Sequence, residues 1–337
     1  MYYTSLQSQS DLFDTTTMEY AFNAKSIEEL ESWKTAAKKR LWEITGMNLC
    51  RKTALDSVRS SVTEENGIQK EYRIINTEPG ISMPFWLFRP KKPNGAAVIV
   101  PHSHGGGKDA SLRLTTDGKN YVTELAERGY LVVCPDDRGS GERREFPQQG
   151  EGEEKNRSNS HREVNNIALG FGQAVIGLFV WDLMCMIDFL TGEEGIKPGK
   201  IACTGMSGGG QKSLWLAALD DRIGLAMTSG YFYGIKESHL LLPHNCSCNF
   251  IPYIYKTMDI GDIGALIAPK PFMIESGTND HLNGEPGINN VYPQVEITRK
   301  AYDLFGSGDK LIHNVHDGKH EWRGIGILDF LDRHLSG

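Results

Sequence analysis

The sequence predicts an α/β fold with a mostly parallel central sheet flanked by helices. Two observations predict it. Short, purely apolar runs, such as residues 96–100 and 130–134, alternate with stretches whose apolar residues recur at helical spacing. These runs lack the in-and-out alternation of a half-exposed strand, so they are typical of parallel strands, which are buried on both faces. With 337 residues, the chain is long enough for one large domain of this kind.

Residues 1–62 are predicted to form an N-terminal helical extension, and residues 63–337 the α/β domain. Ser26 stands three positions before Glu29, which is the capping-box signature of a helix start. Apolar residues then follow at helical spacing, which predicts an amphipathic helix packed on a neighbour. They are Leu30, Trp33, Ala37, Leu41 and Trp42.

From about residue 67 the chain is predicted to alternate strands and helices. Strands at 72–75 and 81–88, separated by Glu-Pro-Gly, predict an antiparallel hairpin. Apolar runs predict the other strands at 96–100, 130–134, 200–204, 223–228, 271–275 and 311–315. Helices are predicted at 121–127, 174–190, 207–219 and 324–334. Gly177, Asp182 and Asp188 interrupt the second of these helices, so we expect a buried helix rather than a membrane span.

Two stretches break this alternation. Residues 143–165 are polar and acidic, which predicts a surface loop. Residues 231–262 are long and rich in aromatic, histidine and cysteine residues. Because long ordered insertions in compact domains are usually functional, we expect this segment to form a cap or the wall of a pocket.

Composition narrows the class of partner. The net charge is −7 and no lysine or arginine block stands out, so we expect neither nucleic acid nor a membrane as a partner. The six cysteines do not form a disulfide framework, and the first residues carry no basic start followed by an apolar core. These features favour a cytoplasmic protein. The oligomeric state is left open.

The segment Gly205-Met-Ser207-Gly-Gly209 has the pattern G-x-S-x-G. A serine in this pattern sits in a strained turn between a strand and a helix, where flanking glycines avoid the clash that a Cβ atom would cause. An apolar strand precedes the motif and a helix-forming run follows it, which favours a nucleophile. The alternative is a glycine-rich turn with a helix-capping serine.

An acid and a histidine are expected later in the chain, each just after a strand. Asp280 follows the strand at 271–275, and His320 follows the strand at 311–315. An imidazole there can take the serine proton and return it to the leaving group, while the carboxylate orients the ring. Competing candidates remain: Glu275 and Asp317 for the acid, and His313 and His316 for the base. Strand alternation makes His313 a structural histidine.

The backbone N–H of Gly208 is the first candidate for an oxyanion hole, because it follows the serine. The second donor is expected in the glycine-rich loop after the strand at 96–100, where His104 is the candidate and Gly105 the alternative. This loop lacks the spacing of a phosphate-binding P-loop, so a nucleotide role is disfavoured. The sequence assigns no substrate-binding side chains.

Two further clusters are weaker. Arg138 lies among carboxylates in residues 136–143, a pattern that favours a structural ion pair over a site for a substrate carboxylate. His244, Cys246 and Cys248 lack the paired spacings of a zinc site, so a pocket wall or core is favoured. We therefore expect neither a metal nor a cofactor.

The ordered motifs HSHGGGK, DDRGSGE, GMSGGG, GTND and DGKH resemble the α/β-hydrolase superfamily. More narrowly, the chain resembles its dienelactone-hydrolase and acetyl-xylan-esterase-like branch, over roughly residues 25–335. The resemblance implies Ser207 as nucleophile, Asp280 as acid, His320 as base, and His104 with Gly208 as oxyanion donors. The chain has Ser103 where such families usually have glycine. It also lacks the arginine after the serine that marks glucuronoyl esterases.

These observations predict a serine esterase that works through an acyl-enzyme and removes acetyl or another small acyl group from a carbohydrate or a similar small ester. The alternatives are a peptidase or amidase of the same fold, which a comparison of ester with amide substrates would reveal, and a non-catalytic binding module, which fluorophosphonate labelling would exclude.

Overall fold

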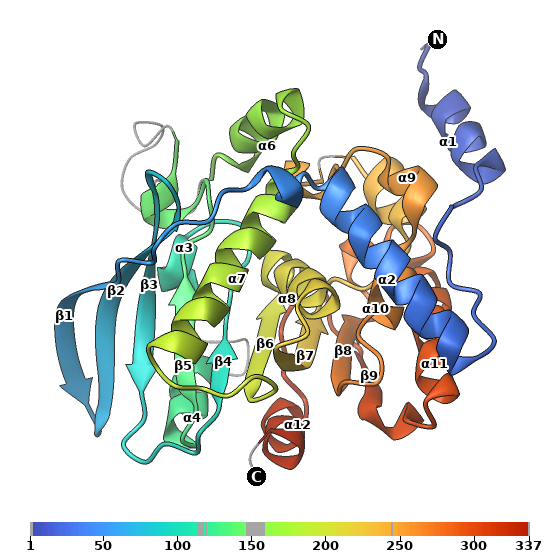
Figure 1. The fold of residues 1–337 in the computed structure, drawn as a ribbon. Helices are drawn as coiled ribbons and strands as arrows, with labels where there is room; N and C mark the ends of the chain where they lie inside the picture. Colours follow the sequence, from blue (N-terminus) through green and yellow to red (C-terminus); the bar gives the residue numbers. More distant parts are fainter. Residues whose placement is uncertain (1–2, 113–117, 119, 146–158, 244, 336–337) are drawn as a thin grey trace.

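A mixed sheet forms the centre of the molecule in the computed structural model, which describes residues 3–112, 118, 120–145, 159–243 and 245–335. Over these residues the sheet has nine strands in the order β1-β2-β3-β5-β4-β6-β7-β8-β9 (Figure 1). The strands are β1 (Val58–Glu65), β2 (Ile68–Glu78), β3 (Ile81–Arg89), β4 (Ala97–Ile99), β5 (Leu131–Pro135), β6 (Ile201–Met206), β7 (Ile223–Ser229), β8 (Phe272–Gly277) and β9 (Leu311–His316).

The first three strands are antiparallel, and β3 also pairs antiparallel with β5. From β5 to β9 all neighbours are parallel, so the carboxyl ends of β6, β7, β8 and β9 meet at one edge. The predicted hairpin and the six other predicted strands are confirmed. Strand β1 was not predicted, because its residues are all exposed and carry no apolar face. The expected end of the N-terminal extension, residue 62, falls inside this strand.

Helices cover both faces of the sheet (Figure 1). The α-helices are α1 (Leu6–Thr15), α2 (Ile27–Ile44), α3 (Gly107–Ala110), α4 (Tyr121–Glu127), α6 (His161–Gly170), α7 (Val175–Gly192), α8 (Gly208–Leu219), α9 (Ile254–Thr257), α10 (Ile260–Ala265), α11 (Tyr292–Leu304) and α12 (Ile327–His334). The short helical turns are η1 (Met47–Leu49), η2 (Gly141–Arg143), η3 (Lys236–Leu240), η4 (Ser247–Asn249), η5 (His281–Asn283), η6 (Gly287–Asn290) and η7 (Gly308–Lys310). The four helices predicted in the α/β domain and the predicted amphipathic helix α2 are confirmed.

Two apolar cores lie on opposite faces of the sheet. Along β5, Leu131 and Val133 belong to the core that contains α2, α7, α8, α10 and α11, whereas Val132 and Cys134 belong to the core that contains α4 and α12. Successive side chains of a strand point to opposite faces, so a strand in this position must be apolar throughout. The apolar runs that predicted the strands are therefore explained by burial on both faces.

Helix α7 packs across the larger core. Its length and composition alone would let it cross a membrane, but 78% of the apolar window is buried inside the protein. Asp182 on this helix is also buried, where it accepts hydrogen bonds from two arginines described below. The environment is that of a core helix, as the sequence predicts.

The expected surface loop at 143–165 is wrong for its last residues, which form the first turn of α6. Val164 and Ala168 of this helix are buried in the larger core. The Asn165 side chain is also buried, and its polar atoms are satisfied there. Its amide donates to the carbonyl oxygen of Ser247 at 2.8 Å, and its Oδ1 accepts from the N–H of Val175 at 2.8 Å. Because residues 143–165 are polar in composition, these buried positions could not be predicted from the sequence. Residues 146–158 lie outside the described part.

Within the insertion at 231–262, His239 is 4% exposed, and its two ring nitrogens have no hydrogen-bond partner among the described residues. The rings of Tyr231 and Tyr233 pack around it at centroid distances of 6.2 and 5.8 Å. This burial lowers the pKa of His239 from 6.5 to about 3.

His239 should therefore make the fold acid-sensitive. Between pH 6.5 and 3 the unfolded chain binds a proton there that the folded chain does not, so the contribution of His239 is complete above pH 6.5 and is lost as the pH falls toward 3. When the pH is lowered from 7 to 4.5, the unfolding free energy of the native chain should fall, and that of His239→Phe should fall by about 2 to 3 kcal/mol less. Urea titration at the two pH values measures both decreases. His281→Phe, at a histidine whose side chain is 71% exposed, is the control. Equal losses in His239→Phe and the native chain would contradict the prediction.

Candidate active site

Ser207 lies in the turn between β6 and α8, with a backbone φ of +56° and ψ of −118°. A positive φ is unfavourable for a residue with a side chain, and such strain persists only where the surroundings impose it. Here the turn is so tight that a Cβ atom on Gly205 would lie 2.6 Å from the carbonyl carbon of Gly209. The G-x-S-x-G pattern thus forms the strained strand-to-helix turn that the sequence predicts.

Neighbouring backbone holds the Ser207 turn against the next strand. The N–H of Ser207 donates to the carbonyl oxygen of Ser229 at 2.8 Å, at the end of β7. The following residue, Gly230, is so close to the candidate base that a Cβ atom there would lie 3.1 Å from Cε1 of His320 and 3.4 Å from Oδ2 of Asp280. Parallel pairing therefore gathers the three residues at one edge of the sheet.

His320 and Asp280 form a hydrogen-bonded pair. Nδ1 of His320 lies 2.7 Å from Oδ2 of Asp280, and Oδ1 of Asp280 accepts from the N–H of Leu282 at 2.9 Å. With Nδ1 donating to the carboxylate, Nε2 of His320 is left as the proton acceptor. The Ser207 hydroxyl makes no hydrogen bond to His320 in the described residues. Bonds of this kind often tighten only when substrate is bound.

The two competing acids have other partners. Glu275 accepts hydrogen bonds from the Ser229 hydroxyl at 2.8 Å and from the backbone N–H groups of Arg323 and Ile325, both at 3.1 Å. These bonds tie the segment after His320 to β7 and β8. Asp317 is 90% exposed and pairs with Arg323. Among the described acids, Asp280 is therefore the one that hydrogen-bonds to His320.

The two competing histidines also have structural partners. Nε2 of His313 lies 3.2 Å from the Ser276 hydroxyl, and burial lowers the pKa of this imidazole to about 4. Nδ1 of His316 accepts from the N–H of Gly318 at 3.1 Å, which shapes the turn that leads to His320. The structural role expected for His313 fits these contacts.

The glycine-rich loop at 102–108 meets the start of α8. A Cβ atom on Gly208 would lie 2.9 Å from Cε1 of His104, so the imidazole of His104 packs directly on the residue after Ser207. The N–H of Gly208 belongs to the first turn of α8, where backbone donors have no partner within the helix. Gly107 has a φ of +58° and lies so close to Asp136 that a Cβ atom would be 2.3 Å from Oδ1. The structure thus brings the His104 side chain and Gly208 together.

A buried ion pair that the sequence did not predict supports this loop. Lys212 of α8 pairs with Asp137 after β5, and its Nζ also donates to the carbonyl oxygen of His102 at 2.6 Å. Nε2 of His102 accepts from the N–H of Asp137 at 3.2 Å. Burial lowers the pKa of His102 to about 3, so the ring is neutral at pH 7. Lys212 stands between Gln211 and Ser213, and a lysine among polar residues is ordinarily exposed, so the sequence gave no signal of a buried cation.

Arg138 is a structural ion-pair residue, as expected. Its guanidinium donates to both oxygens of Asp182, at 2.9 and 2.8 Å, and to Glu78 at 2.8 Å. Arg143 donates to Asp182 at 2.8 Å. Burial alone would raise the pKa of Asp182, but the charges of the two arginines outweigh it and lower that pKa to about 2.

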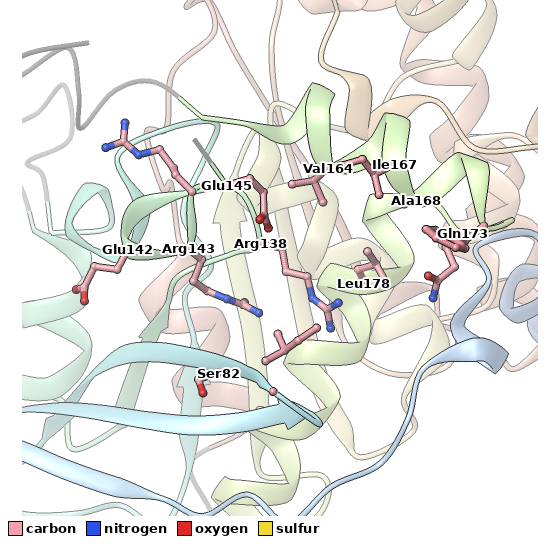
Figure 2. A pocket seen from close by; sticks show the side chains of 14 residues that line it. Ser82, Arg138, Glu142, Arg143, Glu145, Val164, Ile167, Ala168, Gln173 and Leu178 are labelled. Atoms are coloured by element: carbon pink, nitrogen blue, oxygen red, sulfur yellow. The ribbon is translucent and has the colours of Figure 1, made fainter. Parts of the chain in front are cut away.

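The two arginines also line a cavity of about 550 Å³ between the β2–β3 turn and helices α6 and α7. Figure 2 shows Arg138 and Arg143 extending into it opposite Val164 and Leu178. None of the triad candidates lines this cavity. Because its guanidinium groups are already paired with carboxylates, the cavity is not the candidate active site.

A larger cleft of about 880 Å³ opens beside the candidate triad. Its wall includes His104 and His281, the residue after Asp280. The insertion supplies half of the lining, as expected for a pocket wall: Leu242, Pro243, Asn245, Cys246, Ser247 and Phe250. Asn159, Arg162, Glu163 and Leu282 complete it. The lining combines polar side chains with apolar surface from residues such as Leu242, Pro243 and Phe250, so the cleft can hold a ligand with both hydroxyl groups and apolar faces.

Comparison with known proteins agrees with this arrangement. The sequence profile of the dienelactone hydrolase family matches residues 83–285. YtaP of Bacillus subtilis (strain 168), assigned as a hydrolase, is 27% identical over 258 residues, covering 73% of this chain and 80% of YtaP. Carbohydrate esterase MZ0003, from an unknown prokaryotic organism, is 24% identical over 193 residues, covering 48% of this chain and 45% of the esterase.

Solved structures share the fold. A protein of Bacteroides fragilis NCTC 9343 assigned as an acetyl xylan esterase has a TM-score of 0.81 at 17% identity, covering 100% of this chain and 96% of that chain. For the methylesterase BT1017 the TM-score is 0.71 at 18% identity, covering 98% of this chain and 68% of that chain. For a glucuronoyl esterase from Solibacter usitatus the TM-score is 0.63 at 16% identity, covering 96% of this chain and 97% of that chain. With a family profile that matches more than half of its length, the chain is a hydrolase that belongs to the dienelactone hydrolase family, a branch of the α/β-hydrolase superfamily.

Proposed function

We propose that this chain is a serine esterase that removes acetyl or a similarly small acyl group from a carbohydrate. The observation that carries the proposal is the pairing of His320 with Asp280 at 2.7 Å, at the sheet edge where Ser207 occupies a strained turn. A carboxylate that accepts from Nδ1 leaves Nε2 free to take a proton, which is the state a general base needs.

In the proposed reaction, the Ser207 hydroxyl oxygen attacks the ester carbonyl carbon and its proton passes to Nε2 of His320. The N–H groups of His104 and Gly208 donate to the oxyanion that forms. The carbon–oxygen bond to the alcohol then breaks, and the alcohol leaves with the proton from His320. Water, deprotonated by His320, attacks the acyl-enzyme and releases the carboxylic acid and the free Ser207 hydroxyl.

Polar side chains in the cleft support a carbohydrate as the alcohol part of the substrate. Side chains such as Asn159, Arg162, Glu163 and Asn245 offer donors and acceptors for sugar hydroxyl groups. The names of several similar proteins point the same way, since they include a carbohydrate esterase and an acetyl xylan esterase. Gly208 stands where glucuronoyl esterases carry an arginine, so an acetyl ester is preferred to a glucuronoyl ester.

The test is a comparison of substrates on the purified chain. We expect turnover of p-nitrophenyl acetate and of an acetylated xylo-oligosaccharide, little turnover of the matching p-nitroanilide, and a fluorophosphonate adduct that mass spectrometry locates on Ser207. An adduct on another residue, or faster cleavage of the anilide than of the ester, would contradict the proposal.

A further inference from the structure

Three potential metal ligands from distant parts of the chain converge beside the cleft. Nδ1 or Nε2 of His104 and the sulfur atoms of Cys246 and Cys248 all lie within 4.8 Å of one another. Nε2 of His104 lies 3.1 Å from Sγ of Cys248. His104 belongs to the glycine-rich loop, whereas Cys246 immediately precedes η4 and Cys248 lies within it.

A second imidazole faces the same group. Nδ1 of His161, in the first turn of α6, lies 3.7 Å from Sγ of Cys246. Its other nitrogen, Nε2, lies 2.8 Å from the Ser140 hydroxyl. Metal-binding histidines commonly use one ring nitrogen for the metal and hold the ring in place through the other. His161 is 1% exposed, so this orientation is set by the core.

Two of these separations are close to those of a tetrahedral site. With Zn–S bonds of about 2.3 Å and Zn–N bonds of about 2.0 to 2.1 Å, a sulfur and a nitrogen ligand lie roughly 3.5 Å apart. The distances of 3.7 Å between Cys246 and His161 and of 3.1 Å between His104 and Cys248 differ from this value by about 0.2 to 0.4 Å, roughly the adjustment one rotamer allows. We propose that His104, Cys246 and Cys248, with His161 as the fourth ligand, bind a zinc-class divalent cation.

The chemistry of the donor set selects the class of metal. Thiolate and imidazole together suit borderline-soft ions such as Zn²⁺, whereas Mg²⁺ and Ca²⁺ take oxygen ligands. Both cysteines can bind such an ion as thiolates, the form of cysteine that serves as a metal ligand. Hydrogen bonding alone would use these groups only in weak S–H···N contacts.

Such a cation would join three segments that the chain supplies separately: the loop that carries the His104 N–H, the start of α6, and the pocket wall at η4. The Asn165 amide already bonds to the carbonyl oxygen of Ser247, between the two cysteines. The cation would therefore fix the wall of the cleft relative to the glycine-rich loop. This role goes beyond the proposed esterase activity and does not depend on it.

The test measures metal binding directly, on the full chain with its thiols reduced by a phosphine. After removal of metal with a chelator, titration with Co²⁺ should give thiolate-to-cobalt charge-transfer absorption and the visible d–d bands of a tetrahedral site, saturating at about one ion per chain. Zn²⁺ should displace the Co²⁺. X-ray absorption of the Zn²⁺-loaded chain should show two sulfur neighbours at about 2.3 Å.

Cys246→Ser and Cys248→Ser should each weaken Zn²⁺ binding more than about 100-fold, because loss of a group that merely orients a ligand already costs about 10- to 100-fold. Cys50→Ser is the matched control, since Cys50 is a half-buried thiol outside the cluster. It should bind Zn²⁺ as the native chain does. Absence of the charge-transfer band in the folded native chain, a zinc spectrum with nitrogen and oxygen neighbours alone, or equal affinity of all three variants would overturn the proposal. None of these readouts requires hydrolysis, so they are independent of the failure or success of the esterase proposal.

Discussion

Ser207→Ala should lower kcat for p-nitrophenyl acetate by about 10⁵- to 10⁶-fold, since loss of a triad nucleophile in a serine hydrolase costs on the order of 10⁶. Alanine removes one oxygen atom and keeps the backbone turn. The Ser207 hydroxyl has no hydrogen-bond partner among the described residues, and the bonds that hold the turn are made by backbone N–H and carbonyl groups. Unfolding free energy should therefore change by less than about 0.5 kcal/mol.

Ser213→Ala is the matched control, because Ser213 lies on the same helix and is also buried. Its hydroxyl donates to the carbonyl oxygen of Gly209 at 2.9 Å and accepts from the Cys203 thiol at 3.2 Å, inside the fold. This variant should lose about 1 kcal/mol of stability and retain kcat within a few-fold. Both quantities follow from initial rates and urea unfolding of the same preparations. A Ser207→Ala protein with kcat within about 10-fold of native would refute the nucleophile assignment.

The parts of the fold that could be predicted are those where burial decides the residue type. Strands such as β4 and β5 are buried on both faces, so their sequences are apolar throughout and predict them. Strand β1 could not be predicted, because a fully exposed edge strand is held by backbone pairing alone and its side chains carry no pattern. The start of α6 could not be predicted for a related reason, since its buried Asn165 is a polar residue. The hydrogen bonds that allow its burial are made with Ser247 and Val175, about 80 and 10 residues away in the chain.

The same distinction applies to the candidate site. The order of serine, acid and histidine, each after a strand, could be predicted. The carboxyl ends of parallel strands lie at one edge of the sheet, so residues that follow these strands come close together. The choice between Asp280 and Glu275 could not, since both end or follow β8 and only the hydrogen bonds separate them. The cluster of His104 with Cys246 and Cys248 was likewise beyond a search for local spacing, because its members come from segments more than 140 residues apart.

Asp280→Asn should lower kcat by about 10⁴-fold with KM nearly unchanged, as expected when a triad carboxylate becomes an amide. The asparagine can donate its N–H to Nδ1 of His320, which places the ring proton on Nε2. The imidazole would then face Ser207 with a donor instead of an acceptor and could not take its proton. The 2.7 Å contact between Asp280 and His320 is the structural basis of this expectation. It is measured by steady-state kinetics on p-nitrophenyl acetate.

Glu275→Gln separates the two acids, because the same chemical change there should affect stability instead of the reaction. Glu275 accepts from the Ser229 hydroxyl and from two backbone N–H groups, and an amide can replace only part of that acceptor capacity. Loss of one such bond in a buried site should cost about 1 to 3 kcal/mol of unfolding free energy. The folded fraction should keep kcat within about 10-fold, since the Asp280–His320 pair is intact. The reverse pattern, with kcat collapsing in Glu275→Gln and preserved in Asp280→Asn, would assign the acid to Glu275.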